Sequence, residues 1–307
     1  MHYYLAPMEG ITTYIYRNAH AKYFGGIDKY FTPFISDKNF VNERSSGKEH
    51  IPLKNKSINA RELRDTLPEN NAKIPLVPQI LTNNADRFLA VGRQISSYGY
   101  DTVNLNLGCP SGTVTAKKRG SGFLSIPDEL DAFLYEIFEK CPLKISVKTR
   151  LGISDLAEWD RLLDIYTRYP IHELIIHTRL QQEFYAGSTH PEAYALAALR
   201  VQTRIPLCYN GDIVSLESLK KISGTVESAE YTGLNRIMIG RGIIQNPALA
   251  NHLRTDDAPI HSADTVHSKK IWRAFHDEIL DGYIQIMSGD SPTLFKMKEL
   301  WTYMSRS

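Results

Sequence analysis

Short apolar runs rich in Val, Ile and Tyr alternate along the chain with longer amphipathic stretches, and this alternation limits the possible folds more than any other feature. Eight runs have the length of a β-strand, namely Tyr3–Ala6, Lys29–Phe34, Leu76–Ile80, Thr102–Asn106, Lys144–Lys148, Glu173–His177, Pro206–Asn210 and Arg236–Gly240. The intervening stretches have helical spacing, over Thr13–Phe24, Asn84–Tyr98, Pro127–Lys140, Asp155–Tyr169, Pro191–Gln202, Ser215–Ile222 and Asn246–Arg254. Eight β-then-α steps within about 250 residues predict an α/β protein, a (β/α)8 TIM barrel. A doubly wound parallel sheet is the competing interpretation.

Two segments do not fit the β/α repeat. The connection of about 40 residues between Phe34 and Pro75 is polar and partly basic, which favours extra strands and turns over one crossover helix. After Arg254 the sequence TDDAPIHSAD is typical of a linker, and helical patterns follow at Ser268–Met287 and Thr293–Ser305. We therefore predict a catalytic barrel over residues 1–254, with an insertion at about 35–74, and a small all-helical domain over 255–307. The chain stops at Ser307 without a helix-stop signal, so truncation stays open.

Composition and charge exclude several classes of protein. The hydrophobic fraction of 42% rules out a disordered chain, and a net charge of +2 does not indicate a nucleic-acid partner, so any attraction to phosphate must be local. Three cysteines without a CxxC pair fit neither a disulfide framework nor a structural zinc site, and the histidines have no metal-ligand spacing. The N-terminus lacks a secretory signal, and the apolar runs are too short to span a membrane. These features predict a cytoplasmic protein without a metal.

Polar residues follow nearly every predicted strand at the end where barrel enzymes carry their chemistry. Core packing would favour apolar residues there, so seven polar ends among eight indicate a polar ligand over the barrel mouth. The residues are Pro7, Met8 and Glu9; Gln79; Asn104 and Asn106; Lys148 and Arg150; His177 and Arg179; Asn210, Gly211 and Asp212; and Gly240, Arg241 and Gly242.

The turns after the last two predicted strands have the composition of a barrel phosphate site. In Asn210–Asp212 and Gly240–Gly242 the glycines allow the backbone to approach a phosphate, and Arg241 adds a bidentate charge. Neither GxGxxG nor GxxxxGK[ST] occurs, which argues against a Rossmann or P-loop site. Flavin mononucleotide (FMN) fits this spread of ligands, with Lys148 and Gln79 beneath its polar ring. The alternatives are ordinary turns and a buried Lys–Asp pair.

Cys109 lies just past the fourth predicted strand, in the sequence NLNLGCP. A lone cysteine is more often a small buried apolar residue than a catalyst. The interruption of the fold by Gly-Cys-Pro at the functional face nevertheless favours a catalytic role here. A thiol with a pKa near 8.5 stays protonated at neutral pH and can donate a proton. Cys141, at a helix end, and Cys208, within a strand, are interpreted as inert.

The segment after Cys109, SGTVTAKKRGSGFL, carries three cations and no acid. Lys117, Lys118 and Arg119 are followed by glycines, which make the segment mobile. As a loop beside a flavin site and a candidate acid, it is interpreted as a contact for a phosphodiester backbone. A solvated surface loop is the alternative.

These residues together resemble the tRNA-dihydrouridine synthase family. The similarity runs over about 240 residues, through LAPMEGIT at Leu5–Thr12, PQI at Pro78–Ile80, NLNLGCP at Asn104–Pro110, VKTR at Val147–Arg150, HTR at His177–Arg179, NGDI at Asn210–Ile213 and GRG at Gly240–Gly242. The family consists of FMN-bearing (β/α)8 barrels with a C-terminal helical domain. Its members use NADPH to reduce the C5–C6 double bond of particular uridines in tRNA.

The resemblance implies a role for each matched residue. It places FMN contacts at Pro7, Met8, Glu9, Gln79, Lys148, His177, Asn210, Gly211, Asp212, Gly240 and Arg241. It makes Cys109 the acid that protonates C5 after the flavin N5 has delivered hydride to C6. It implies a contact to RNA at Arg179. Further contacts to RNA are predicted at Asn104 and at the three cations of the basic segment, Lys117, Lys118 and Arg119. No obligatory protein partner is implied.

Two other functions remain open. A flavin barrel that acts on a free pyrimidine, such as a dihydroorotate dehydrogenase, would share the fold and the flavin but would not need the basic segment or the helical tail. A non-catalytic RNA-binding protein on the same scaffold would not need a proton donor. The sequence leaves open the target uridine, the choice between NADPH and NADH, and the oligomeric state.

Overall fold

The computed structural model describes residues 1–37, 58–202, 204–229, 231, 233–255 and 265–305. Ten strand segments form one parallel sheet in the order β3-β5-β6-β7-β8-β9-β10-β1-β2-β4. Their bounds are β1 His2–Leu5, β2 Lys29–Phe31, β3 Ile35–Ser36, β4 Leu76–Val77, β5 Gln79–Leu81, β6 Thr102–Leu107, β7 Lys144–Arg150, β8 Glu173–His177, β9 Leu207–Asn210 and β10 Arg236–Ile239. All the strand pairs within it are parallel, as the β/α alternation predicts.

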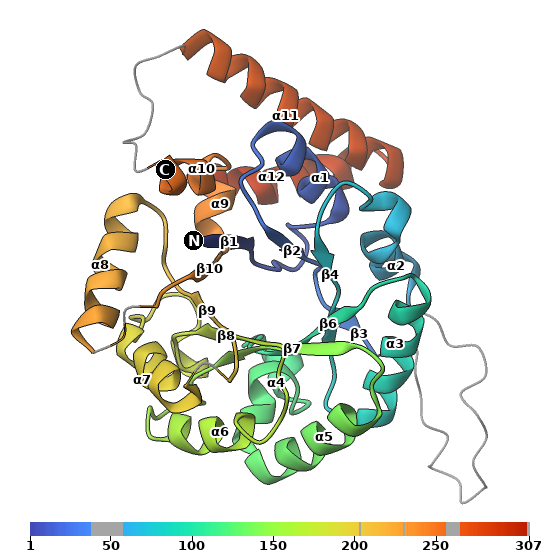
Figure 1. Ribbon diagram of the computed structural model, residues 1–307. Helices are drawn as coiled ribbons and strands as arrows, with labels where there is room; N and C mark the ends of the chain where they lie inside the picture. Colours follow the sequence, from blue (N-terminus) through green and yellow to red (C-terminus); the bar gives the residue numbers. More distant parts are fainter. Residues whose placement is uncertain (38–57, 203, 230, 232, 256–264, 306–307) are drawn as a thin grey trace, which may run out of the picture.

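The sheet closes into a barrel. The pair β3–β5 at one end of the strand order and the pair β2–β4 at the other are halves of the same two barrel strands. Segments β2 and β3 are two halves of one barrel strand interrupted around Pro33, and β4 and β5 are halves of the next strand, interrupted at Pro78. Proline has no N–H to donate to a ladder, so each interruption divides a strand. Tyr30 in β2 pairs with Leu76 in β4, and Ile35 in β3 pairs with Ile80 in β5. The ten segments are therefore the eight strands of a barrel (Figure 1).

Helices surround this barrel in Figure 1. Their bounds are α1 Tyr14–Tyr23, α2 Ala60–Thr66, α3 Ala85–Ser97, α4 Gly112–Thr115, α5 Pro127–Lys140, α6 Glu158–Tyr166, α7 Pro191–Val201, α8 Leu216–Ser228, α9 Arg241–Gln245, α10 Leu249–Thr255, α11 Thr265–Ile286 and α12 Asp290–Met304, with short 3-10 turns η2 Pro68–Asn70, η3 Gly120–Ser125 and η4 Gln181–Glu183. Within the described residues, no helix is long and apolar enough to cross a membrane.

The predicted (β/α)8 barrel is confirmed, and most of the predicted elements are present. Strand β8 and helix α5 have the predicted bounds, whereas α8 runs six residues beyond the predicted Ile222 to Ser228. The insertion differs from expectation, because its described part contains the helix α2 and the turn η2 rather than added strands. Asn59 caps α2 by accepting a hydrogen bond from the backbone N–H of Glu62. The rest of the insertion lies outside the described residues.

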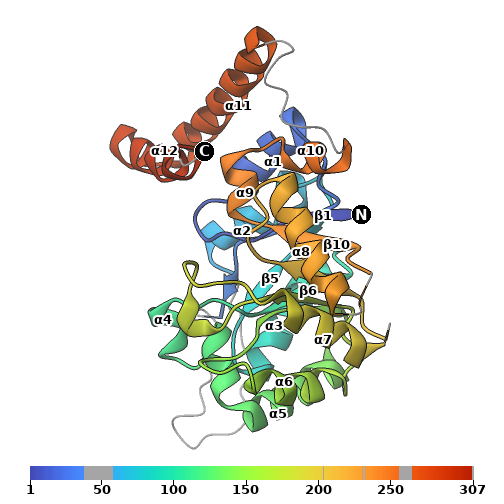
Figure 2. The ribbon, with the colours of Figure 1, turned by 90° about the vertical axis from the view of Figure 1, so that its left-hand side faces the viewer.

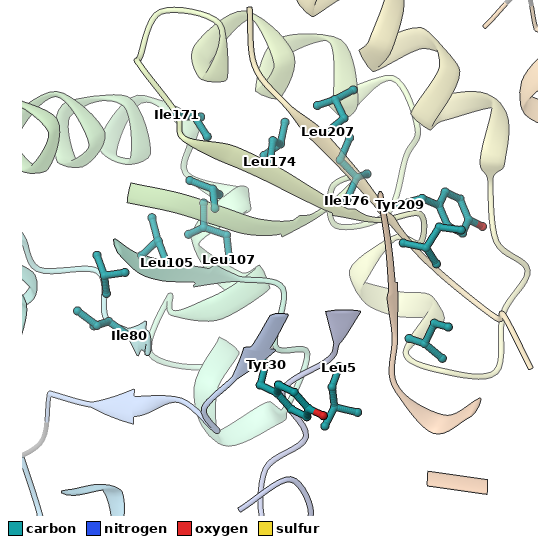
Figure 3. Packing of buried hydrophobic residues seen from close by; sticks show 14 of the residues in the cluster. Leu5, Tyr30, Ile80, Leu105, Leu107, Ile171, Leu174, Ile176, Leu207 and Tyr209 are labelled. Atoms are coloured by element: carbon teal, nitrogen blue, oxygen red, sulfur yellow. The ribbon is translucent and has the colours of Figure 1, made fainter. Parts of the chain in front are cut away.

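Apolar residues form two separate clusters, one inside the barrel and one around it. The larger cluster packs the outer faces of the strands against the helices, and Figure 3 shows part of it, including Leu105, Leu174 and Ile176. The smaller cluster fills the interior with Tyr4, Ala6, Phe31, Val77, Ile175, Cys208 and Met238. Inward and outward side chains thus alternate along each strand. The interior apolar layer forms a base on which the polar strand ends rest.

The last two helices pack on one side of the barrel. Helix α11 contacts α1, and α12 contacts both α11 and α9. In Figure 2 the two helices project beyond the barrel next to α1 and α9. Phe275 of α11 is fully buried against Tyr16 and Phe24, with edge-on ring contacts at 5.7 and 5.1 Å between centroids. The division into two domains near residue 254 stays a prediction, and the predicted linker lies outside the described residues except for Thr255, the last residue of α10.

Candidate active site

A cavity of about 640 Å³ opens at the C-terminal ends of the barrel strands. It is lined by Cys109 and by all eleven residues that the sequence assigned to a cofactor, namely Pro7, Met8, Glu9, Gln79, Lys148, His177, Asn210, Gly211, Asp212, Gly240 and Arg241. Barrel enzymes place their reacting groups at this face. Residues up to 234 positions apart in the chain are therefore brought together, from Pro7 to Arg241.

A chain of hydrogen-bonded amides forms part of the cavity floor. The Nδ2 of Asn106 donates to Oε1 of Gln79 at 2.8 Å, and the Nε2 of Gln79 donates to Oδ1 of Asn104 at 2.7 Å. Asn104 in turn donates to the hydroxyl of Ser146 at 2.9 Å. Every member of the chain is thereby fixed in one orientation. The Asn104 side chain is fully buried beneath Gln79 and does not line the cavity, which argues against its predicted contact with RNA.

Two cations, Lys148 and Arg150, lie side by side on β7 because alternate residues of a strand face the same side. Burial, and then the charge of Arg150, lowers the pKa of Lys148 to about 7. Within the described residues, the Lys148 ammonium forms no hydrogen bond or ion pair. Arg150 donates to the carbonyls of Gly108, Leu180 and Phe184 at 2.9, 2.8 and 2.6 Å, and these acceptors are uncharged. The cavity floor therefore carries positive charge that no bonded carboxylate neutralises.

Two arginines share one carboxylate at the cavity wall. Arg179 binds Asp212 through its two terminal guanidinium nitrogens, and Arg241 binds the same carboxylate at 2.6 Å. Burial alone would raise the pKa of Asp212, but the bonds to the two arginines outweigh it and lower that pKa below its usual value. His177 is buried beside Lys148 and both arginines, so its pKa lies far below the usual value and its imidazole is neutral at pH 7. The wall group has one net positive charge.

The turn that carries Cys109 is held at its start and at its end. Asn106 Oδ1 accepts hydrogen bonds from the backbone N–H groups of Gly108 and Cys109, both at 3.0 Å. The Cys109 carbonyl accepts from the N–H and the hydroxyl of Ser121 at 3.1 and 3.0 Å. Gly120 has φ +54°, and a Cβ there would lie 2.7 Å from that carbonyl, so only glycine fits. Burial raises the pKa of the Cys109 thiol, which therefore stays protonated at neutral pH.

The basic segment after Cys109 is divided between surface and interior. Lys117 and Lys118 are exposed to solvent. Arg119 points inward and forms an ion pair at 2.6 Å with Asp37, which is fully buried at the end of β3 and also binds Arg87 and Thr82. This pairing argues against the predicted contact of Arg119 with RNA, because a buried carboxylate already holds its guanidinium.

Comparison with known proteins assigns this chain to a family. The family model for dihydrouridine synthase matches residues 4–289, which include every residue of the cavity floor and wall described above. The chain belongs to the dihydrouridine synthase family. A probable tRNA-dihydrouridine synthase of Staphylococcus aureus (strain Mu50 / ATCC 700699) is 29% identical over 246 residues, which cover 79% of this chain and 68% of that protein.

Two further comparisons concern the family and the fold. The probable tRNA-dihydrouridine synthase 2 of Bacillus subtilis (strain 168) is 30% identical over 246 residues, covering 79% of this family member and 69% of that protein. The solved structure of QR15, an aldolase, aligns with a TM-score of 0.50 and 14% identity over 83% of this chain and 94% of its own. At that identity the likeness shows the fold alone.

Several residues of this dihydrouridine synthase family member line the cavity although no specific role was predicted for them, and of these only Asn106 stood among the predicted polar strand ends. Asn106 shares the inward face of β6 with Asn104, and the alternation of strand residues was the available signal. Phe184 and Tyr185 line the cavity from the loop after β8, while Glu299 and Tyr303 do so from α12. No local pattern in the sequence indicates that the last helix reaches the first strand's end. Of the residues predicted to contact RNA, only Arg179 lines the cavity.

Proposed function

We propose that this protein reduces the C5–C6 double bond of a uridine in tRNA, with bound FMN and with NADPH as the electron donor. The observation that carries the proposal is the convergence of Cys109 and eleven predicted cofactor contacts on one cavity, in a chain that belongs to the dihydrouridine synthase family. The family's relatives bear the name tRNA-dihydrouridine synthase.

The donor set of the cavity fits a flavin phosphate and ring. The Arg179–Asp212–Arg241 group has one net positive charge, which suits a bound phosphate. Gly211 allows close packing there, since a Cβ at this position would lie 2.9 Å from the Thr178 hydroxyl. On the floor, the unpaired ammonium of Lys148 suits the negative charge of a reduced isoalloxazine, and the amide chain through Gln79 offers fixed polar contacts. When bound, FMN would accept hydride from NADPH and deliver hydride to uridine C6.

The chain itself supplies the proton. Reduction of the double bond adds hydride at C6 and a proton at C5, so a positioned acid must face C5. Cys109 meets this requirement, because it lines the cavity, its thiol is kept protonated by burial, and its turn is held by Asn106 and Ser121. Neutral His177 and cationic Arg150 do not compete for this role, since the first has a strongly lowered pKa and the second is held by three carbonyls.

Phosphate contacts to tRNA are assigned to exposed cations near the mouth. Lys117 and Lys118 follow the Cys109 turn by a few residues and are exposed, and the hydrogen bond of Lys118 to the Ser125 hydroxyl at 3.2 Å leaves its ammonium at the surface, where it can meet a phosphodiester backbone. Such contacts position the RNA so that one base can leave the stack and enter the cavity.

The test is turnover with defined substrates. Purified protein supplied with FMN and NADPH should form dihydrouridine in tRNA, measured by mass spectrometry of digested nucleosides, but should not reduce free uracil or oxidise dihydroorotate. Reduction of a free pyrimidine without tRNA turnover would favour the dihydroorotate dehydrogenase-like alternative. Binding of tRNA without flavin bleaching by NADPH would favour the non-catalytic alternative.

A further inference from the structure

Two consecutive aromatic residues stand at the lip of the cavity and differ in what surrounds their rings. Phe184 and Tyr185 are 52% and 53% exposed, and both line the cavity. The Tyr185 ring is engaged within the protein, 5.4 Å from the Arg150 guanidinium, 5.8 Å from that of Arg241 and 6.2 Å from the His177 ring. Within the described residues, the Phe184 ring stacks on no aromatic or cationic side chain. An open aromatic face is therefore available at the mouth of the site.

The backbone holds Phe184 in a strained conformation. Its φ of +48° and ψ of −106° are unusual for a bulky residue, and glycine would adopt a positive φ at far lower cost. The carbonyl of Phe184 accepts from Arg150 at 2.6 Å, and the carbonyl of Tyr185 accepts from Arg241 at 2.9 Å. Strain of this kind persists only where surrounding contacts enforce it, and it gathers at ligand-binding sites.

The same loop is fastened to the turn that carries Cys109. The side-chain amide of Gln181 donates to the Ser121 hydroxyl at 3.0 Å, and Ser121 holds the Cys109 carbonyl. Glu183 accepts from the Leu180 N–H at 2.6 Å and binds His190 at 2.9 Å. The backbone of Phe184 is therefore held relative to the proposed proton donor, and it places the exposed ring at the lip of the cavity.

We propose that Phe184 is a stacking platform for the nucleotide next to the uridine that enters the cavity, an inference that rests on the proposed function. Removing one base from a stack exposes the face of its neighbour, and an aromatic ring at the lip can cover that face. Stacking of a base on an aromatic side chain does not depend on base identity, and its loss weakens binding about 5- to 150-fold. Phe184 thus contributes to tRNA binding through the flanking nucleotide, while the reacting atoms lie deeper.

The test uses Phe184→Gly, because glycine relieves the backbone strain and should leave the fold at least as stable. We expect kcat/KM for tRNA to fall about 5- to 150-fold, an unchanged rate of flavin reduction by NADPH, and an unfolding midpoint that does not fall. Phe184→Trp should retain turnover. Tyr135→Ala is the matched control, since Tyr135 is 63% exposed on α5 and lies outside the cavity.

A second measurement identifies the stacked nucleotide. Once the reduced uridine is mapped, tRNA with an abasic site immediately 5′ or 3′ of it is compared with intact tRNA. One abasic substrate should lower wild-type kcat/KM by about the same factor as Phe184→Gly, and the two changes together should add nothing further. Equal turnover by wild type and Phe184→Gly on intact tRNA would overturn the inference alone. Absence of dihydrouridine with wild-type protein would overturn the proposed function as well.

Discussion

The two ends of the barrel differ in how their buried charged side chains are paired. At the N-terminal end, the carboxylate of Glu173 accepts from the Tyr4 hydroxyl at 2.8 Å and from Lys29 at 2.9 Å, and lies 3.6 Å from Arg236. At the C-terminal end, Lys148 has no bonded partner in the described residues, and Arg150 is held by three carbonyls and by Tyr185, none of which is charged. The Glu173 carboxylate thus pairs with the cations around it, whereas the Lys148 ammonium, which lines the cavity, pairs with no carboxylate in the described residues. Stability and function are thus assigned to opposite ends of the same strands.

The sharpest test of this division is Cys109→Ala at the C-terminal end. Positioned general-acid catalysis contributes about 10² to 10⁴ in rate, so dihydrouridine formation should fall by that factor. The rate of flavin reduction by NADPH should not change, because that half-reaction does not involve the thiol. Stopped-flow absorbance and product analysis measure the two steps separately. Cys208→Ala, in the barrel interior, should retain catalysis, and wild-type turnover by Cys109→Ala would show that another group is the acid.

The reciprocal substitution is Glu173→Gln at the N-terminal end. Removing one partner of a buried ion pair costs about 3 kcal/mol, the lower end of the usual range, because Lys29 and Arg236 can still reach water. Urea unfolding should show this loss, while kcat per folded, flavin-loaded molecule should stay unchanged. A loss of kcat in folded protein without a loss of stability would break the comparison.

Lys148→Met tests how far the unpaired ammonium of Lys148 lowers the free energy of unfolding. Because the folded pKa is about 7 and the unfolded value is about 10.4, the burial penalty is full below pH 7 and declines to zero as pH rises to about 10.4. The free energy of unfolding of flavin-free wild type should therefore rise over that window. Lys148→Met should flatten the rise and be about 1 kcal/mol more stable at pH 7, while binding FMN more weakly. A less stable Lys148→Met would show that the ammonium is satisfied.

The smallest effect concerns phosphate contacts. Substituting Lys117 and Lys118 with Ala should lower the log–log salt slope of tRNA binding by about one per lysine. Arg119→Ala should leave that slope unchanged, since its guanidinium is paired with Asp37. Lys144→Ala, at the N-terminal end of β7, is the matched control and should also leave it unchanged. Filter binding at several salt concentrations measures all three, and an unchanged slope without Lys117 and Lys118 would place the RNA elsewhere.

Local patterns in the sequence were enough to predict the barrel and the cavity lining. The ends of parallel strands meet at one face whatever the details of packing, so polar residues such as Gln79, His177 and Arg241 could be grouped without a structure. The division of two strands into halves could not be predicted from apolar runs that simply contain Pro33 and Pro78.

The sequence could not show which side chains turn inward or reach the cavity, because their positions depend on residues that are distant in the chain. Nothing in Lys117, Lys118 and Arg119 indicates which cation turns inward, because that is decided by Asp37, 82 positions earlier. Asn104 and Asn106 both face the barrel interior. They differ in depth, because Asn104 is fully buried whereas Asn106 lines the cavity, and the sequence does not show this difference. Likewise, Glu299 joins the site through the packing of α12.

The pairing of β1 with β10 has a consequence for synthesis on the ribosome. Strand β1 is complete at Leu5, but its neighbour ends at Ile239, so at about 5–20 residues per second the two are separated by about 10–50 s of translation. During that interval the nascent chain presents one unpaired strand edge, which is a template for association with other chains. The cavity wall is completed later still, because Tyr303 of α12 is made after the other residues that line it. The candidate site is therefore complete only after α12 has been made.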